Sequence, residues 1–171
     1  MSAVNDIQLL CETVLHFNAD GLRKFNFSRN DLFQQWTSSF VETMNESTNN
    51  MFSKEQSFQI ANALMNSLQK VKVTVDASYS ESKVEITVNG MDFEKEFAPE
   101  SLHFNIMPGA EPKEIAVAVV KAIVDKFDEM KPSKSTVFSI DCEFDKKSNF
   151  WMPKDLQEFF KNLSVNAMGG K

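Results

Sequence analysis

Tyr79, Asp76 and Asp141 carry the side chains that could support acid–base chemistry in this sequence. A proton-transfer site needs a carboxylate base and a phenol or acid donor that point into one pocket. Tyr79 is the single tyrosine, and it is in phase with the apolar residues of a strand expected over 71–79. We therefore expect it to face the core with its hydroxyl at the rim. Asp76 and Asp141 are out of phase with their apolar neighbours and are expected to point to solvent, so the pattern predicts no proton-transfer pair.

The histidines form no recognisable metal or nucleophile motif. Glu12 and His16 are four residues apart and could share one helix face, but two ligands do not make a zinc site. His103 lies on a different element. The chain has only five glycines and no glycine-rich phosphate loop. We therefore predict no catalytic, metal-binding or cofactor-binding residues and no cofactor.

The two cysteines, Cys11 and Cys142, have two interpretations. A disulfide between them would close a long loop and add about 4–5 kcal/mol in the chain-entropy model. Alternatively, both are lone thiols that are buried as small hydrophobic residues. A thiol titration with and without reductant distinguishes the two states.

Phenylalanine is abundant, with 16 residues against one tyrosine and two tryptophans. Phenylalanine and methionine fill a core without needing hydrogen-bond partners, so a filled core is the simpler interpretation. The same side chains could instead line an apolar pocket for a small ligand. The candidate lining residues are Trp36, Phe40, Met44, Tyr79, Phe138, Ile140 and Trp151.

Length and charge restrict the class of protein. A chain of 171 residues is most simply one domain, and about 70% of its unfolded surface can be buried. The net charge of −6 argues against nucleic-acid binding, which needs clustered basic residues. No apolar run of about 18 residues is present, so no transmembrane segment is expected. The first residues lack the pattern of a signal peptide, so we expect either an intracellular protein or a mature region whose leader was removed.

Hydrophobic periodicity predicts a helical region over residues 1–70. Apolar residues recur at spacings of three and four over 4–17 and again over 31–44. The polar residues 45–50 should fray the second of these helices. Ser53 and Gln56 predict a capping box at the start of a further helix that runs to Gln69.

The period changes to two at Val71, which predicts a hairpin over 71–91 and a second over 134–152. Between them, 92–131 should be a partly helical connection whose aromatic side chains pack on the sheet, followed by a helix that starts near Pro112. A last helix is expected over 153–163, with frayed residues after it. Together these elements predict a single α+β domain over 1–171, with about four antiparallel strands and helices on one face.

The second hairpin resembles that of small bacterial surface lipoproteins of unknown function. The resemblance lies in the strand and charged turn of 136–147, in Phe150 and Trp151, and in the helix start at 153–156; residues 88–93 are also similar to that family. It implies a nuclear-transport-factor-2-like, cystatin-like cone: a curved antiparallel sheet around a long helix. It also implies a location outside the cytoplasmic membrane and a binding or scaffolding role, without catalytic residues. This sequence departs from the family's pattern in the leader and the anchoring cysteine that follows it. Cys11 is not expected to carry the lipid, because it lies within a helical stripe.

Three functional hypotheses follow. The first is a non-enzymatic binding or protein-interaction domain at the cell surface, tethered through a removed leader, whose partner is a protein or a small apolar ligand. The second is a small-molecule enzyme of the same fold, of isomerase or dehydratase type. The third is a cytoplasmic interaction subunit. The chain is expected to be a monomer or a homodimer, since the strand edge with Lys72, Thr74 and Asp76 could either pair or stay solvated.

Overall fold

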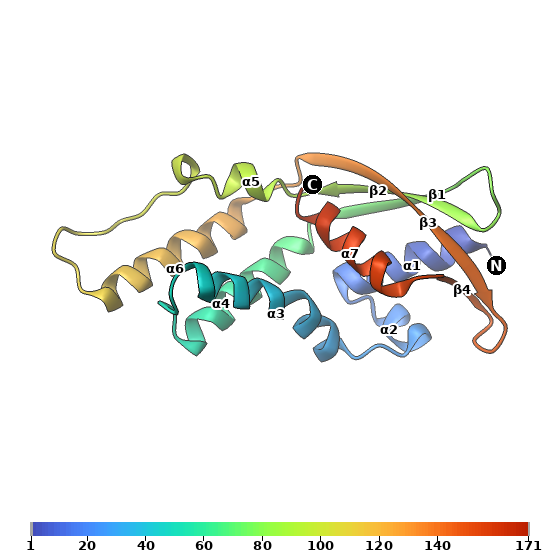
Figure 1. Ribbon diagram of the computed structural model, residues 1–171, viewed down its shortest axis with the longest axis horizontal. Coiled ribbons are helices and arrows are strands. Elements are labelled where there is room, and N and C mark those ends of the chain that lie inside the picture. The colour runs from blue at the N-terminus through green and yellow to red at the C-terminus, as the bar shows by residue number, and fades with distance from the viewer. Residues whose placement is uncertain (1, 171) are drawn as a thin grey trace. The chain divides into compact units, whose positions relative to one another are not determined.

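The computed structural model describes residues 2–170, which form two compact units. Unit 1 combines the N-terminal segment up to Arg29 with Val71–Asp92 and the C-terminal segment from Pro132. Unit 2 combines Asn30–Lys70 with Phe93–Lys131. Figure 1 shows the order of the elements along the chain. The expectation of one domain over 1–171 stays a prediction.

Unit 1 is built on one antiparallel sheet in the order β1-β2-β3-β4. Each strand pairs with the next one along the chain, and the sheet curls around two helices (Figure 1). The predicted α+β fold with a curved four-stranded antiparallel sheet is confirmed. The strands are β1 (Lys72–Ala77), β2 (Lys83–Gly90), β3 (Lys134–Asp145) and β4 (Phe150–Pro153).

The period-two pattern of β2 sets the buried face of the sheet. Val84, Ile86 and Val88 are buried, while Glu85 and Asn89 are exposed. Because successive side chains of a strand point to opposite faces, this alternation places the apolar side of the sheet against helices. The expected inward and outward sides of β2 are therefore confirmed.

Three helices complete unit 1: α1 (Ala3–His16), α2 (Ala19–Phe25) and α7 (Leu156–Ala167). α1 contacts β1 and β4, whereas α7 contacts β2, β3 and β4. The stripe of α1 is buried, as its 3–4 spacing predicts. The two helices together cover the apolar face of the sheet.

α1 also covers both edges of the sheet through polar side chains. The Gln8 amide donates from Nε2 to the Val73 carbonyl at 2.9 Å and accepts the Val75 N–H at 2.9 Å. On the other edge, Asp6 Oδ2 accepts the Trp151 N–H at 2.9 Å. Unpaired edge groups are a template for pairing with other chains. Here the backbone groups of Val73, Val75 and Trp151 are engaged within the chain.

α7 is longer than the sequence predicts. It continues beyond residue 163 to Ala167, which is fully buried, so the expected frayed end is wrong. The Met91 N–H donates to the Ala167 carbonyl at 2.9 Å, and a side chain at Gly90 would collide with the backbone oxygens of Asn166 and Ala167. Close contact with the end of β2 therefore holds the last turn in place.

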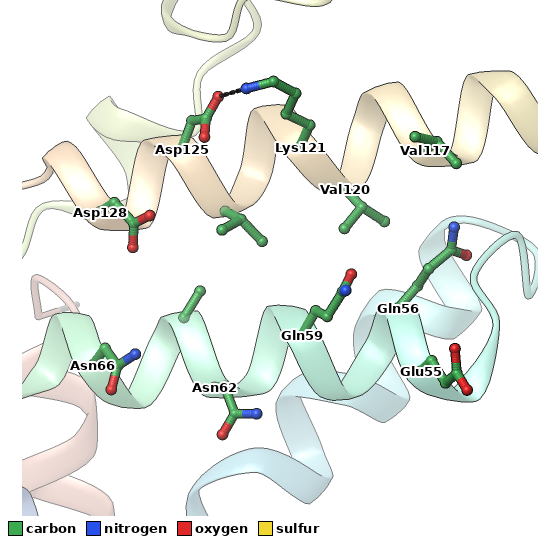
Figure 2. Close-up of a pocket in the computed structure, with 12 residues that line it drawn as sticks. Glu55, Gln56, Gln59, Asn62, Asn66, Val117, Val120, Lys121, Asp125 and Asp128 are labelled. Carbon is green, nitrogen blue, oxygen red and sulfur yellow. Dashed lines mark hydrogen bonds and ion pairs between the residues drawn. The ribbon is translucent and has the colours of Figure 1, made fainter.

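Unit 2 is helical. The Ser53 and Gln56 capping box is present at the start of α4, as predicted. α3 continues through Ser47, past the residue at which it is expected to fray. Its Phe40 ring packs edge-on against the ring of Phe127 on α6, with 6.1 Å between the ring centroids. α4 and α6 lie side by side and run in the same direction (Figure 2). The elements of this unit are α3 (Arg29–Ser47, of which Asn30 onward belongs to unit 2), α4 (Lys54–Leu68), α5 (Phe93–Glu96), η1 (Pro99–Ser101) and α6 (Pro112–Glu129).

The aromatic residues after β2 do not pack on the sheet, so that expectation is wrong. Phe93 and Phe97 contact the buried ring of Phe127 at 5.7 and 4.9 Å between centroids. Phe104 is 46% exposed and Met107 73% exposed. Phe93 and Phe97 therefore join the core of unit 2, to which residues 93–131 belong.

Candidate functional site

An open groove of about 670 Å³ lies between α4 and α6 of unit 2 (Figure 2). Each helix buries one stripe and turns another part of its surface toward the groove. On α4, Ile60, Leu64 and Leu68 are fully buried. The groove is lined from α4 by Glu55, Gln56, Gln59, Asn62, Ala63 and Asn66, and from α6 by Val117, Val120, Lys121, Val124, Asp125 and Asp128.

The α4 wall is rich in amides. Figure 2 shows Gln56 and Gln59 directed toward α6. Gln56 uses its carbonyl oxygen to cap its own helix, whereas the side chains of Gln59, Asn62 and Asn66 make no hydrogen bond within residues 2–170. A carboxamide can donate two hydrogen bonds and accept two. This wall therefore offers hydrogen-bonding capacity that the described chain does not use.

The α6 wall is apolar in its middle. Val117, Val120 and Val124 are spaced by three and four residues, so they form one stripe along the helix. Val117 is 60% exposed, and Val120 points into the groove in Figure 2. Val124 is half-buried and Val120 is only 6% exposed, so Val117 offers most of the apolar surface that this stripe presents to a ligand.

The charges of the groove are mostly negative. Lys121 Nζ donates to Asp125 Oδ2 at 2.7 Å, and this hydrogen bond together with the carboxylate charge raises the pKa of the exposed Lys121. Glu55 and Asp128 form no ion pair within residues 2–170. They lie at opposite ends of the groove, near the start of α4 and near the end of α6 (Figure 2). The groove thus has an apolar middle, an amide wall and a free carboxylate at each end.

The structure divides the seven candidate lining residues between the two units. Trp36, Phe40 and Met44 are half-buried on α3 of unit 2. In unit 1, Ile140 is buried, while Phe138 and Trp151 are half-buried. Ile140 lines a small pocket of about 140 Å³ on β3, and none of the seven lines the α4–α6 groove.

The expectation that Tyr79 faces the core is wrong. β1 ends at Ala77, and Tyr79 follows in the bend, where its side chain is fully exposed. The alternation of the strand cannot set the direction of a residue that lies outside it. Asp76 and Asp141 are exposed as predicted, and Asp141 lies 3.8 Å from Lys83 Nζ.

Glu12 and His16 bind different partners. His16 Nε2 lies 2.7 Å from the Val71 carbonyl oxygen, and Glu12 accepts from Gln8. Within residues 2–170, no group of three histidine, cysteine or carboxylate side chains converges as a metal site requires. His16 therefore links α1 to Val71, the residue before β1, whereas the hydrogen bond of Glu12 lies within α1.

The cysteines are two free, buried thiols. Burial raises the pKa of the Cys11 thiol far above its ordinary value, with smaller contributions from Glu12 and from Cys142. Burial, followed by the charge of Asp141, raises the pKa of Cys142 to about 11. Since the thiolate is the nucleophile, these residues are poor candidates for reactive groups.

The sequence contained two signals of the groove. Val117 is an apolar residue outside the main stripe of its helix, and an amide or small residue recurs at 56, 59, 63 and 66. Gln59, Asn66 and Val117 are exposed, whereas Ala63 is only 5% exposed and belongs to the buried core. Only the pairing of α4 with α6 makes the two faces parts of one site.

No helix within residues 2–170 is both long and apolar enough to cross a lipid bilayer. No family model matches the chain, and no curated protein matches it significantly.

Among solved structures, the chain is similar to the crystal structure of a "putative lipoprotein (ycdA)" from Bacillus subtilis. The TM-score is 0.62 at 14% sequence identity, and the match covers 99% of this chain and 56% of that protein. The chain therefore spans little more than half of its neighbour's length. At this identity the likeness concerns the fold, while the assignment to the nuclear-transport-factor-2-like family stays a prediction. The chain thus has an α+β fold that is similar to that of a protein named as a lipoprotein.

Proposed function

We propose that this chain is a non-enzymatic binding module that acts outside the cytoplasm, and that the α4–α6 groove is its binding site. The observation that carries the proposal is the groove itself, where an apolar stripe of α6 faces Gln56 and Gln59 (Figure 2). Of the four amides that line it, Gln59, Asn62 and Asn66 have no hydrogen-bond partner for their side chains in the described chain. Such a surface can recognise a ligand by shape and hydrogen bonding. Its valines and amides do not serve as general acids, bases or nucleophiles.

Two findings support the extracytoplasmic location. The fold is similar to that of a protein named as a lipoprotein. The second hairpin and the start of α7 also resemble those of bacterial surface lipoproteins. A tether through a lipidated leader is the corresponding mode of attachment. The proposal is therefore a surface module that presents unit 2 to a ligand.

Site-specific photocrosslinking in intact cells tests the binding site. A photoreactive amino acid at Gln59 lies in the groove, and the same amino acid at Glu143 lies on exposed β3 of unit 1 as a control. We expect an adduct of defined mass from position 59 and none from position 143. Equal labelling from both positions, or none from either, would contradict the proposal.

A matched pair of substitutions separates the groove from general surface effects. Val117→Asp changes a groove residue that is 60% exposed, and Val137→Asp makes the same change on β3 at 57% exposure. We expect Val117→Asp to abolish the adduct from position 59, whereas Val137→Asp should leave it unchanged. Circular dichroism and thermal unfolding of both variants verify that each one folds.

Protease protection tests the location. The full-length natural product of the gene, tagged at its C-terminus, is expressed in its own host, and intact cells are treated with a protease. Digestion of the tag while a cytoplasmic marker stays intact is expected. A tag that is cleaved only after the cells are lysed would instead support the intracellular alternative.

A further inference from the structure

We infer that the α4–α6 groove takes a short basic amphipathic helix of a partner protein. This inference rests on the proposed function and specifies its ligand. It is carried by three features of the groove: its two helical seams, its length, and the placement of its carboxylates.

The walls of the groove have the spacing of a helix-packing seam. On α4, residues 56, 59, 63 and 66 recur at intervals of three, four and three. On α6, Val117, Val120 and Val124 recur at intervals of three and four. Two parallel helices with such seams leave the holes into which the side chains of a third helix fit. Ala63 and Val120 are only 5% and 6% exposed and form the floor between the two walls, so the third helix would pack mainly on the exposed Gln59 and Val117.

The length of the groove fits a helix of about three turns. The lining residues of α4 run from Glu55 to Asn66, and those of α6 run from Val117 to Asp128. Each wall therefore extends about 16 Å at the helical rise of about 1.5 Å per residue. Isolated helices of this length are marginal in water, so the partner segment is expected to become ordered on binding.

The charges of the groove select a basic partner. Lys121 is paired with Asp125, which leaves Glu55 and Asp128 as the unpaired carboxylates at the two ends. The whole chain carries a net charge of −6, which repels an acidic partner. A helix with leucine or valine in its middle and lysine or arginine near both ends complements this arrangement. Gln59 and Asn66 can then bind polar side chains on the rim of that helix.

Two designed peptides of about 18 residues test the inference. Both carry leucine at heptad a and d positions; one has lysine and the other has glutamate at most of the remaining positions. Fluorescence anisotropy measures their binding to the whole protein. We expect the lysine peptide to bind and the glutamate peptide to bind at least about tenfold more weakly. A lysine peptide with a central proline should also bind more weakly, because proline breaks its helix.

A charge-neutralising variant identifies the site of binding. The double variant Glu55→Gln/Asp128→Asn should weaken the lysine peptide about tenfold, since it removes both ion pairs. The control Glu81→Gln/Glu143→Gln makes the same charge change at exposed positions of unit 1 and should leave the affinity unchanged.

Two results would overturn the inference: equal loss of affinity in both double variants, or equal binding of the lysine, glutamate and proline peptides. In either case, a crosslink from position 59 that depends on Val117 would still support a binding groove with a different ligand. Failure of both experiments would remove the groove as a binding site.

Discussion

Replacing Asp6 with alanine should destabilise unit 1 more than any removal of a surface charge. The Asp6 side chain is 2% exposed, and its Oδ1 accepts from Lys24 Nζ at 2.6 Å. Its second oxygen accepts the Trp151 N–H at 2.9 Å. One carboxylate on α1 thus connects α2 to the edge strand β4, so its removal affects three elements at once.

The expected loss in the free energy of unfolding follows from the two groups that Asp6→Ala leaves without their partner, the Lys24 ammonium and the Trp151 N–H. Removing one partner of a fully buried ion pair costs about 3–5 kcal/mol. The Lys24 side chain is 27% exposed and can be partly solvated, which lowers that cost. The unsatisfied Trp151 N–H adds about 1–3 kcal/mol. We therefore expect Asp6→Ala to lower the free energy of unfolding by about 3 kcal/mol, and Asp6→Asn, which keeps an acceptor for Trp151, by about 1–2 kcal/mol.

Urea unfolding followed by tryptophan fluorescence measures this effect. In a Trp36→Phe background the signal comes from Trp151, which lies in unit 1. A loss of about 3 kcal/mol should lower the urea midpoint by about 1–2 M.

Asp20→Ala is the matched control. Asp20 pairs with Arg23, and both side chains are more than three-quarters exposed. This substitution should cost at most about 1 kcal/mol. If Asp6→Ala costs no more than Asp20→Ala, the role assigned to the buried carboxylate is refuted.

Three further predictions concern the edge of β1, the thiols and a turn. Gln8→Leu removes two hydrogen bonds to the backbone of β1, so it should cost about 1–3 kcal/mol in urea unfolding and increase self-association in analytical ultracentrifugation. Cys11 and Cys142 should not react with a thiol reagent at pH 8 in the native protein, because the pKa values of both thiols are raised. After unfolding without reductant, two thiols per chain should react, and fewer than two reactive thiols would refute the free-thiol state. Hydrogen bonds from the Ser148 hydroxyl and the Lys147 N–H lower the pKa of the Asp145 carboxyl. This carboxyl therefore contributes to stability above its pKa in the unfolded chain, which is about 4, and the contribution is lost as the pH falls through its lowered pKa in the folded protein. Ser148→Ala should raise the Asp145 pKa in an NMR titration, and an unchanged midpoint would contradict this cause.

The strands could be predicted because their signal is local. Val84, Ile86 and Val88 alternate with polar residues, and a strand with one buried face needs no other information to show which side is apolar. The capping box of Ser53 and Gln56 is equally local, since both partners lie within one turn. These features follow from periods and spacings that a few neighbouring residues define.

Element ends and side-chain environments depended on contacts from elsewhere in the chain. Tyr79 keeps the phase of β1, but the strand stops at Ala77, where the register with β2 ends, so the tyrosine is exposed. α7 extends to Ala167 because Gly90 and Met91 of a distant segment contact its last turn. Periodicity contains no information about such contacts.

The sequence by itself determined the α+β class, the antiparallel hairpins and the buried stripe of each long helix, because these depend on local periodicity and on the cost of exposing apolar surface. Only the tertiary structure decided that the amide face of α4 lies opposite the valine stripe of α6 and that α1 covers both edges of the sheet. The physical reason is that these arrangements join segments far apart in the chain, and their energies arise from complementary surfaces rather than from the pattern of either segment.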